Sequence, residues 1–403
     1  MFSENHKAAG VCYPQGFKAA GVRAGIKKNG NLDVAVIYTE KEAAVAGVFT
    51  KNLVAAAPVH LSKIVVGTGT AHAVVANAGC ANACTGEQGV HDAEKMAIIT
   101  AKELNCRADD VIVASTGLIG SNLPMDKMEA GIKAAVKELS REGSVNAGNA
   151  IVTTDTYSKT LATEVEIGGV EVRFGAIAKG SGMIRPDMAT MLCFITTDAD
   201  IDQKLLQEAL SDANKVSFGC LSVDGDMSTN DTAVILANGA AGNKKIVERG
   251  ADYEKFYETL KNICVELVKK IAADGEGATK FLTINVTGAE SFEDAKRIGM
   301  SVANSPLVKT AFFGQDANPG RTICAVGYSG VKISPEKVTI KFGDLTVYDK
   351  GLVTKFDEAA RKKILAEHDI VVDIELGIGN AAATVYTCDL SFQYVKINAD
   401  YTT

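Results

Sequence analysis

Residues 179–193 have the sequence Lys179-Gly180-Ser181-Gly182-Met183-Ile184-Arg185-Pro186-Asp187-Met188-Ala189-Thr190-Met191-Leu192-Cys193, a glycine-rich turn that leads into an apolar strand. By itself, Thr190 is simply the first residue of that strand, because β-branched residues favour strands. The same residue is a nucleophile if the turn strains the peptide bond that joins it to Ala189. Gly180 and Gly182 would permit such strained backbone angles. The residues alone leave both interpretations open.

The second interpretation has a defined chemistry. The Thr190 hydroxyl would attack the carbonyl carbon of Ala189, the acyl group would move from nitrogen to oxygen, and water would hydrolyse the ester. The cut would leave Thr190 with a free α-amine, whose pKa is typically about 7.7–8.0. Such an amine can act as the base for the hydroxyl of its own residue. No His is required, which agrees with five His residues that never fall at metal-ligand spacing.

Strand-like and helix-like segments alternate along most of the chain. This pattern predicts an α/β or α+β fold with helix-covered sheets. We expect a tight hairpin turn at 377–380, between two of the predicted strands. The predicted strands are 32–38, 71–76, 111–115, 170–174, 192–197, 281–286, 371–376 and 390–395, and the predicted helices are 92–104, 125–139, 202–213 and 253–273.

Composition disfavours several other classes of protein. The chain has 403 residues, 47% of them hydrophobic and 23% charged, as in ordinary globular proteins. Its net charge of −7 disfavours binding along a nucleic-acid backbone. We find neither an apolar run of about 18 residues nor an N-terminal signal sequence, so we expect a soluble, cytoplasmic protein without a membrane partner.

The sequence also gives no sign of a metal or nucleotide cofactor. The nine Cys residues are odd in number and lie mostly among apolar residues, which favours reduced thiols. Cys80 and Cys84 have no second pair at the spacing of a metal site. A phosphate-binding Walker A loop, a dinucleotide-binding glycine motif in its proper context and a Gly-x-Ser-x-Gly elbow are all missing from the sequence.

The segment 178–197 resembles the cleavage signature of the ornithine acetyltransferase family, also called the ArgJ family. The similarity extends from near residue 10 to the C-terminus. One departure is Pro319, where the family pattern leads us to expect Trp, and it concerns loop packing rather than chemistry. The other matching segments, in family order, are 77–86, 115–120, 153–156, 224–232, 274–280 and 305–311.

The resemblance implies a chain that cuts itself between Ala189 and Thr190. The α fragment would be residues 1–189, the β fragment would be 190–403, and the two together would form the catalytic unit. The implied fold is a layered two-sheet α/β sandwich with outer helices, similar to that of N-terminal-nucleophile hydrolases. Mature members are assemblies such as α2β2, which leads us to expect an oligomer.

The resemblance also implies an activity and its residues. Thr190 would take acetyl from N2-acetyl-L-ornithine and pass it to L-glutamate in a ping-pong reaction of arginine biosynthesis. No cofactor is implied, although some members accept acetyl-CoA as a donor and co-substrate. Thr116 and Gly117 would form the oxyanion hole at the end of a strand. The implied substrate-binding residues are Thr153, Lys179, Thr190, Glu276, Asn398 and Thr403.

Charge suggests how the substrate would be held. The Lys179 cation suits a carboxylate and the Glu276 anion suits an ammonium group. Each also has a purely structural interpretation, Lys179 as a solvated turn residue and Glu276 as a charge in a glycine-rich loop. We expect the segment 394–403 to fold back over the site.

Two other functions stay open. One is a self-processing amidohydrolase or aminopeptidase, in which water rather than glutamate resolves the acyl-enzyme. The other is a non-catalytic α/β binding protein in which Thr190 is structural.

Overall fold

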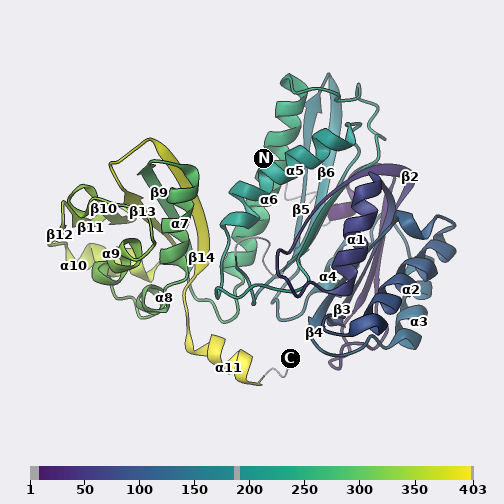
Figure 1. The fold of residues 1–403 in the computed structure, drawn as a ribbon, viewed down its shortest axis with the longest axis horizontal. Helices are drawn as coiled ribbons and strands as arrows, with labels where there is room; N and C mark the ends of the chain where they lie inside the picture. Colours follow the sequence, from purple (N-terminus) through teal and green to yellow (C-terminus); the bar gives the residue numbers. More distant parts are fainter. Residues whose placement is uncertain (1–8, 186–190, 401–403) are drawn as a thin grey trace.

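The structure, a computed structural model, describes residues 9–185 and 191–400. It contains two mixed β-sheets that form two lobes, each packed with helices (Figure 1). The predicted α/β architecture of two helix-covered sheets is therefore confirmed. Within the described residues, no helix is both long enough and apolar enough to cross a membrane.

The first lobe contains an eight-stranded sheet. Its strand order is β4-β3-β2-β8-β7-β6-β5, with β1 also paired to β2. The strands are β1 (Phe17–Val22), β2 (Val34–Phe49), β3 (Thr70–Cys80), β4 (Val111–Leu118), β5 (Lys159–Ile167), β6 (Val170–Lys179), β7 (Leu192–Thr197) and β8 (Thr232–Ala237). The helices are α1 (Ala57–Thr68), α2 (Gly86–Leu104), α3 (Met125–Lys137), α4 (Ser144–Ile151), α5 (Gln203–Val216) and α6 (Ala251–Ala273).

The second lobe contains a six-stranded sheet. Its strand order is β12-β11-β10-β13-β9-β14. The strands are β9 (Phe281–Ala289), β10 (Thr339–Phe342), β11 (Leu345–Asp349), β12 (Leu352–Val353), β13 (Asp369–Glu375) and β14 (Ala381–Cys388). The helices are α7 (Phe292–Ala303), α8 (Pro306–Phe313), α9 (Pro319–Gly327), α10 (Glu358–Ala366) and, after the last strand, α11 (Phe392–Asp400).

Strand β7 is central to the first sheet and is buried on both faces. Cys193 and Ile195 pack into the core that α5 and α6 cover, whereas Leu192 and Phe194 belong to the core on the opposite face. Six consecutive buried residues explain why this segment is apolar without alternation. Helix α6 contacts β5 and β6 of the first sheet and β9 and β14 of the second, so it links the two lobes.

The expected boundary between residues 189 and 190 is not a boundary between lobes. Strands β7 and β8 follow it in sequence, yet they lie between β2 and β6, which precede it. Lys179 of β6 pairs directly with Leu192 of β7. Fragments 1–189 and 190–403 would therefore share one continuous sheet and one core.

Two predictions about the C-terminal region are wrong. The segment 390–395 is not a strand, because β14 ends at Cys388 and α11 begins at Phe392. The Ser391 hydroxyl accepts a hydrogen bond from the Gln393 N–H, as residues at the start of a helix do. The turn 377–380 is not a hairpin, since β9 lies between β13 and β14 and pairs with both.

Pro319, the departure from the family pattern, starts a helix. It is the first residue of α9, where its fixed backbone angle and missing N–H are tolerated. Asn318 caps this helix by accepting a hydrogen bond from the Arg321 N–H at 3.2 Å. The substitution for Trp is therefore compatible with an ordered loop.

Candidate active site

Six of the residues predicted to form the site line one cavity of about 90 Å³. They come from five places in the chain, in both lobes. Ala189, Thr190 and Thr403, which the sequence also predicts to belong to the site, lie outside the described residues. The six are Thr116, Gly117, Thr153, Lys179, Glu276 and Asn398, and the other lining residues are Ala81, Ile119, Thr154, Gly182, Met183, Ser228, Thr229 and Asn230.

Thr116 and Gly117 lie near the C-terminal end of β4, where the pairing of β4 with β3 becomes irregular. Cys80 of β3 faces both Thr116 and Leu118, so the register shifts at this point. Gly117 has a φ of +126°, and a Cβ there would lie 2.5 Å from the backbone of Gly79. Only glycine fits this close approach of two strands. The bulge re-aims the end of β4 toward the cavity.

Asn230 supports this strand end. It lies in the matching segment 224–232 but was not predicted to be a site residue. Its side-chain amide donates hydrogen bonds to the carbonyls of Ala81 at 2.6 Å and Ser115 at 2.8 Å. It is buried and also lines the cavity. Asn230 therefore joins the segment after the expected cut to the strand that carries Thr116.

Lys179 is the last residue of β6, and it is buried rather than solvated, with 2% of its surface exposed. Its ammonium donates a hydrogen bond to the Thr153 hydroxyl at 2.8 Å and lies 3.5 Å from the Thr116 hydroxyl. Burial lowers the pKa of this amine, and an Asp155 carboxylate 3.9 Å away opposes that effect. Lys179 thus brings a positive charge next to two hydroxyl groups of the cavity.

A buried ionic cluster, which the sequence did not reveal, holds the site together. Lys159 has no exposed side-chain surface and forms ion pairs with both Asp155 and Asp274. Its ammonium also donates to the Gly180 carbonyl at 3.1 Å, and the Gly180 N–H donates to Asp155. Burial opposes ionisation of Asp155, but Lys179 and Lys159 hold its pKa below the ordinary value.

This cluster connects three loops that carry predicted site residues. Asp155 accepts a hydrogen bond from the Thr153 N–H at 3.1 Å, and Asp274 lies at the end of α6, two residues before Glu276. The Ser181 hydroxyl donates to the Asp274 carbonyl, and the Glu276 N–H donates to the Ser181 carbonyl. The positions of Thr153, Lys179 and Glu276 are therefore coupled.

The glycine-rich turn in residues 179–193 helps to position Glu276, but its glycines do not have the strained backbone angles that the sequence predicts. Neither Gly180 nor Gly182 has a positive φ, whereas Met183 does, at +56°. A Cβ at Gly182 would lie 2.3 Å from the carboxyl carbon of Glu276. Gly182 is therefore needed for contact with Glu276 rather than for backbone strain.

Helix α11, in the C-terminal segment, covers the Glu276 carboxylate. The Asn398 amide donates a hydrogen bond to Glu276 at 2.7 Å. The Tyr394 hydroxyl lies 3.3 Å from Asp224, which also accepts from the N–H groups of Met183 and Ile184. As far as residue 400, the C-terminal segment folds back over the site as predicted.

Met191 is the first described residue after the expected cut, and two hydrogen bonds fix it. Its N–H donates to Asp231 at 3.2 Å, and its carbonyl accepts from the Thr232 N–H at 3.0 Å. Met191 is 1% exposed. Met191, which follows the predicted nucleophile in the sequence, is therefore held next to the segment 228–230 that lines the cavity.

Two features of the described residues suit acyl transfer. Hydroxyl and backbone donors at a strand end suit a developing oxyanion, while a buried cation and a buried anion suit a charged amino-acid substrate. No group of three or more His, Cys, Asp or Glu suited to a metal ion occurs in ranges 9–185 and 191–400.

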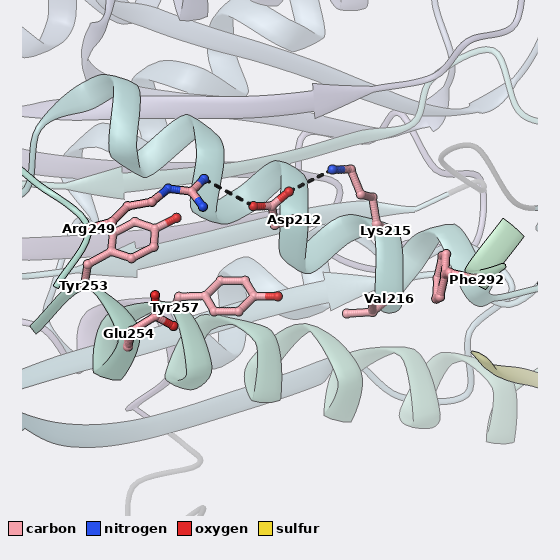
Figure 2. A pocket seen from close by; sticks show the side chains of 8 residues that line it. All are labelled: Asp212, Lys215, Val216, Arg249, Tyr253, Glu254, Tyr257 and Phe292. Atoms are coloured by element: carbon pink, nitrogen blue, oxygen red, sulfur yellow. Dashed lines mark hydrogen bonds and ion pairs between the residues drawn. The ribbon is translucent and has the colours of Figure 1, made fainter. Parts of the chain in front are cut away.

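A separate surface pocket of about 340 Å³ lies between α5 and α6 and includes none of the predicted residues. Figure 2 shows that Arg249 and Lys215 both turn toward Asp212, with which they form ion pairs. These charges therefore satisfy one another at the surface. We assign no chemistry to this pocket.

The chain is similar in sequence to known proteins. A profile of the ArgJ family matches residues 18–403. An "Arginine biosynthesis bifunctional protein ArgJ" from Symbiobacterium thermophilum is 50% identical over 398 residues, which cover 98% of this chain and 99% of the relative. One of the same name from Geobacter sulfurreducens is 47% identical over 390 residues, 96% of this chain and 99% of the relative.

A solved structure of an arginine biosynthesis bifunctional protein ArgJ from Bacillus halodurans is also similar. It is 41% identical, superposes with a TM-score of 0.51, and covers 52% of this chain and 98% of its own. Because the family profile spans nearly all of this sequence and two relatives match it end to end, the chain belongs to the ArgJ family.

Proposed function

We propose that this chain is a self-cleaving acetyltransferase of arginine biosynthesis that moves acetyl from N2-acetyl-L-ornithine to L-glutamate through an acetyl-Thr190 intermediate. The observation that carries the proposal is the convergence of Thr116, Gly117, Lys179 and Glu276 on one cavity beside the fixed residue Met191. Family membership supports the same activity.

Self-cleavage would start with attack of the Thr190 hydroxyl on the Ala189 carbonyl. The C–N bond breaks, an ester forms, the released amine takes the hydroxyl proton, and water hydrolyses the ester. The two fragments would stay associated because β7 and β8 lie within a sheet whose other strands precede the cut. The solved chain from Bacillus halodurans supports this step, since it is about half as long as the present chain and is matched over 98% of its length.

Acetyl transfer would then use the new α-amine of Thr190 as the base. The Thr190 hydroxyl attacks the acetyl carbonyl of N2-acetyl-L-ornithine, ornithine leaves with the proton, and the acetyl group stays on oxygen. The α-amine of glutamate attacks the ester and regenerates the hydroxyl. In both steps the Thr116 hydroxyl and the Gly117 N–H would stabilise the oxyanion.

Substrate recognition would depend on the two buried charges. Lys179 would bind a carboxylate together with Thr153, to which it is hydrogen-bonded. Glu276 would bind an ammonium group, with Asn398 orienting its carboxylate. Thr403 would complete the site from the end of the C-terminal segment. No resident cofactor takes part, and acetyl-CoA would serve only as an alternative donor.

We further infer an assembly of two α and two β fragments or larger, in the cytoplasm. Resemblance to the family supports the assembly, and a reaction between free amino acids supports the compartment.

One experiment separates transfer from hydrolysis. Purified protein is incubated with N2-acetyl-L-ornithine and saturating glutamate, and N-acetyl-glutamate, ornithine and free acetate are quantified together. The proposal predicts that N-acetyl-glutamate and ornithine form in equal amounts. If free acetate dominates at saturating glutamate, the chain is an amidohydrolase of the same architecture.

A further inference from the structure

A second cavity, of about 250 Å³, adjoins the active-site cavity and contains none of its charged residues. Thr153 lines both cavities. Gly79 and Leu118 also line the second cavity, and they lie at the same β3–β4 bulge as Gly117. The remaining wall is the loop 26–29, which contributes Lys27, Lys28 and Asn29. The second cavity therefore lies against the β3–β4 bulge that carries the predicted oxyanion residue Gly117.

Lys27 is held in this wall by a rigid loop. The carboxylate of Asp33, which is fully buried, accepts hydrogen bonds from the N–H groups of Ala24, Ile26 and Lys27 at 2.6–3.0 Å. The Lys27 side chain passes over Gly79, because its Cγ lies 3.2 Å from the place where a Cβ of Gly79 would be. A side chain at position 79 would push Lys27 away from the bulge.

The Lys27 ammonium retains unused capacity to bind an anion. It donates one hydrogen bond, to the Leu32 carbonyl at 2.7 Å. An ammonium has three donors. Across the part of the chain that the structure describes, Lys27 forms no ion pair with a carboxylate. Burial lowers its pKa to about 8, and the nearby Lys179 cation acts in the same direction.

The proposed reaction creates a need for such a group. The two amino acids that react with Thr190 carry opposite charges at the end of their side chains, an ammonium in ornithine and a carboxylate in glutamate. Glu276 would attract the first charge and repel the second. A site that accepts both must offer the glutamate side chain a cation away from Glu276.

We propose that the cavity formed by Lys27, Gly79, Leu118 and Thr153 is the acceptor subsite, in which Lys27 binds the side-chain carboxylate of glutamate. This inference rests on the proposed function and identifies what selects its second substrate. The rest of the substrate would extend into the active-site cavity past Thr153, which both cavities share. When ornithine is bound, Lys27 would have no carboxylate partner, and the side-chain ammonium of ornithine would lie near Glu276.

The test measures the two half-reactions of Lys27→Met separately. Acetylation of Thr190 by N2-acetyl-L-ornithine is followed by ornithine release without acceptor, and transfer is followed with glutamate and with glutamine, its neutral analogue. Loss of a charged hydrogen bond should lower kcat/KM for glutamate on the order of 10- to 100-fold relative to the ornithine step. The preference for glutamate over glutamine should fall by the same factor, and Lys27→Arg should restore most of it.

Lys102→Met is the matched control, because it removes the same charge from an exposed position in the last turn of α2 that does not line this cavity. It should leave both half-reactions and the glutamate preference unchanged. The subsite is disproved if Lys27→Met keeps the wild-type preference for glutamate over glutamine, or if it impairs only the use of acetyl-CoA. If wild-type protein releases no ornithine at all, the proposed function itself fails, which is a different outcome.

Discussion

The carboxyl group of Asp231 accepts a hydrogen bond from the backbone N–H of Met191 at 3.2 Å, and Met191 is covalently bonded to Thr190. Asp231 is fully buried, and its second oxygen has no hydrogen-bond partner among the residues described. Burial raises its pKa well above the ordinary value. Asp231 therefore fixes Met191, the residue that follows the predicted nucleophile in the sequence.

Substitution of Asp231 should separate positioning from charge. Asp231→Ala leaves a buried N–H unpaired at Met191, at a cost of about 1–3 kcal/mol, and should slow both scission and kcat. Asp231→Asn keeps an acceptor oxygen, so this variant should cleave itself and turn over at rates within a few-fold of those of the wild type. Time courses of intact mass and steady-state rates measure both. An Asn variant as impaired as the Ala variant would mean that an ionised carboxylate is required.

The buried cluster should be a major source of stability. Lys159→Met leaves Asp274 buried without its cation and Asp155 with only the more distant Lys179, which should lower the free energy of unfolding by about 3–5 kcal/mol. Denaturant titration in a Thr190→Ala background, where we expect an uncut chain, provides the measurement. Lys133→Met, which removes an exposed ion pair with Glu129, should leave stability unchanged. Equal stability of the two variants would contradict the role given to the cluster.

Thr116 should matter through its hydroxyl. If it helps to stabilise the oxyanion, Thr116→Val should fold and lower kcat by about 10²–10³, whereas Thr116→Ser should retain most of the activity. Steady-state rates at saturating substrate, with circular dichroism as the folding control, give the answer. Wild-type turnover by Thr116→Val would remove this side chain from the oxyanion site.

Lys27 should make acceptor choice depend on pH. Burial lowers its pKa to about 8, with Asp33, Asp155 and Lys179 as the charged groups that act on it. Above that pH, Lys27 loses its proton and the preference for glutamate over glutamine should decline. Both acceptors need the Thr190 amine, so the titration of that amine cancels in the ratio of the rate with glutamate to the rate with glutamine. Lys27→Arg stays protonated, so its ratio should be flat from pH 7 to about pH 9; a flat ratio in wild type would contradict the proposal.

Local patterns in the sequence predicted seven of the described strands but missed others, such as β1, β5 and β8, while the family resemblance identified six of the residues that line the cavity. β7 follows from a continuous apolar run, and Thr116, Lys179 and Glu276 lie within motifs of consecutive residues. The Lys159 cluster could not be predicted because its partners are four and 115 residues away. Helix α11 was missed because it has apolar residues typical of a strand, among them Phe392 and Val395, which the structure shows to be exposed.

The most direct test of the account is the intact mass of denatured, fully active protein. The account predicts two polypeptides, residues 1–189 and 190–403, and a single uncut, inactive chain for Thr190→Ala. Active protein in which every molecule retains the bond between Ala189 and Thr190 would contradict it.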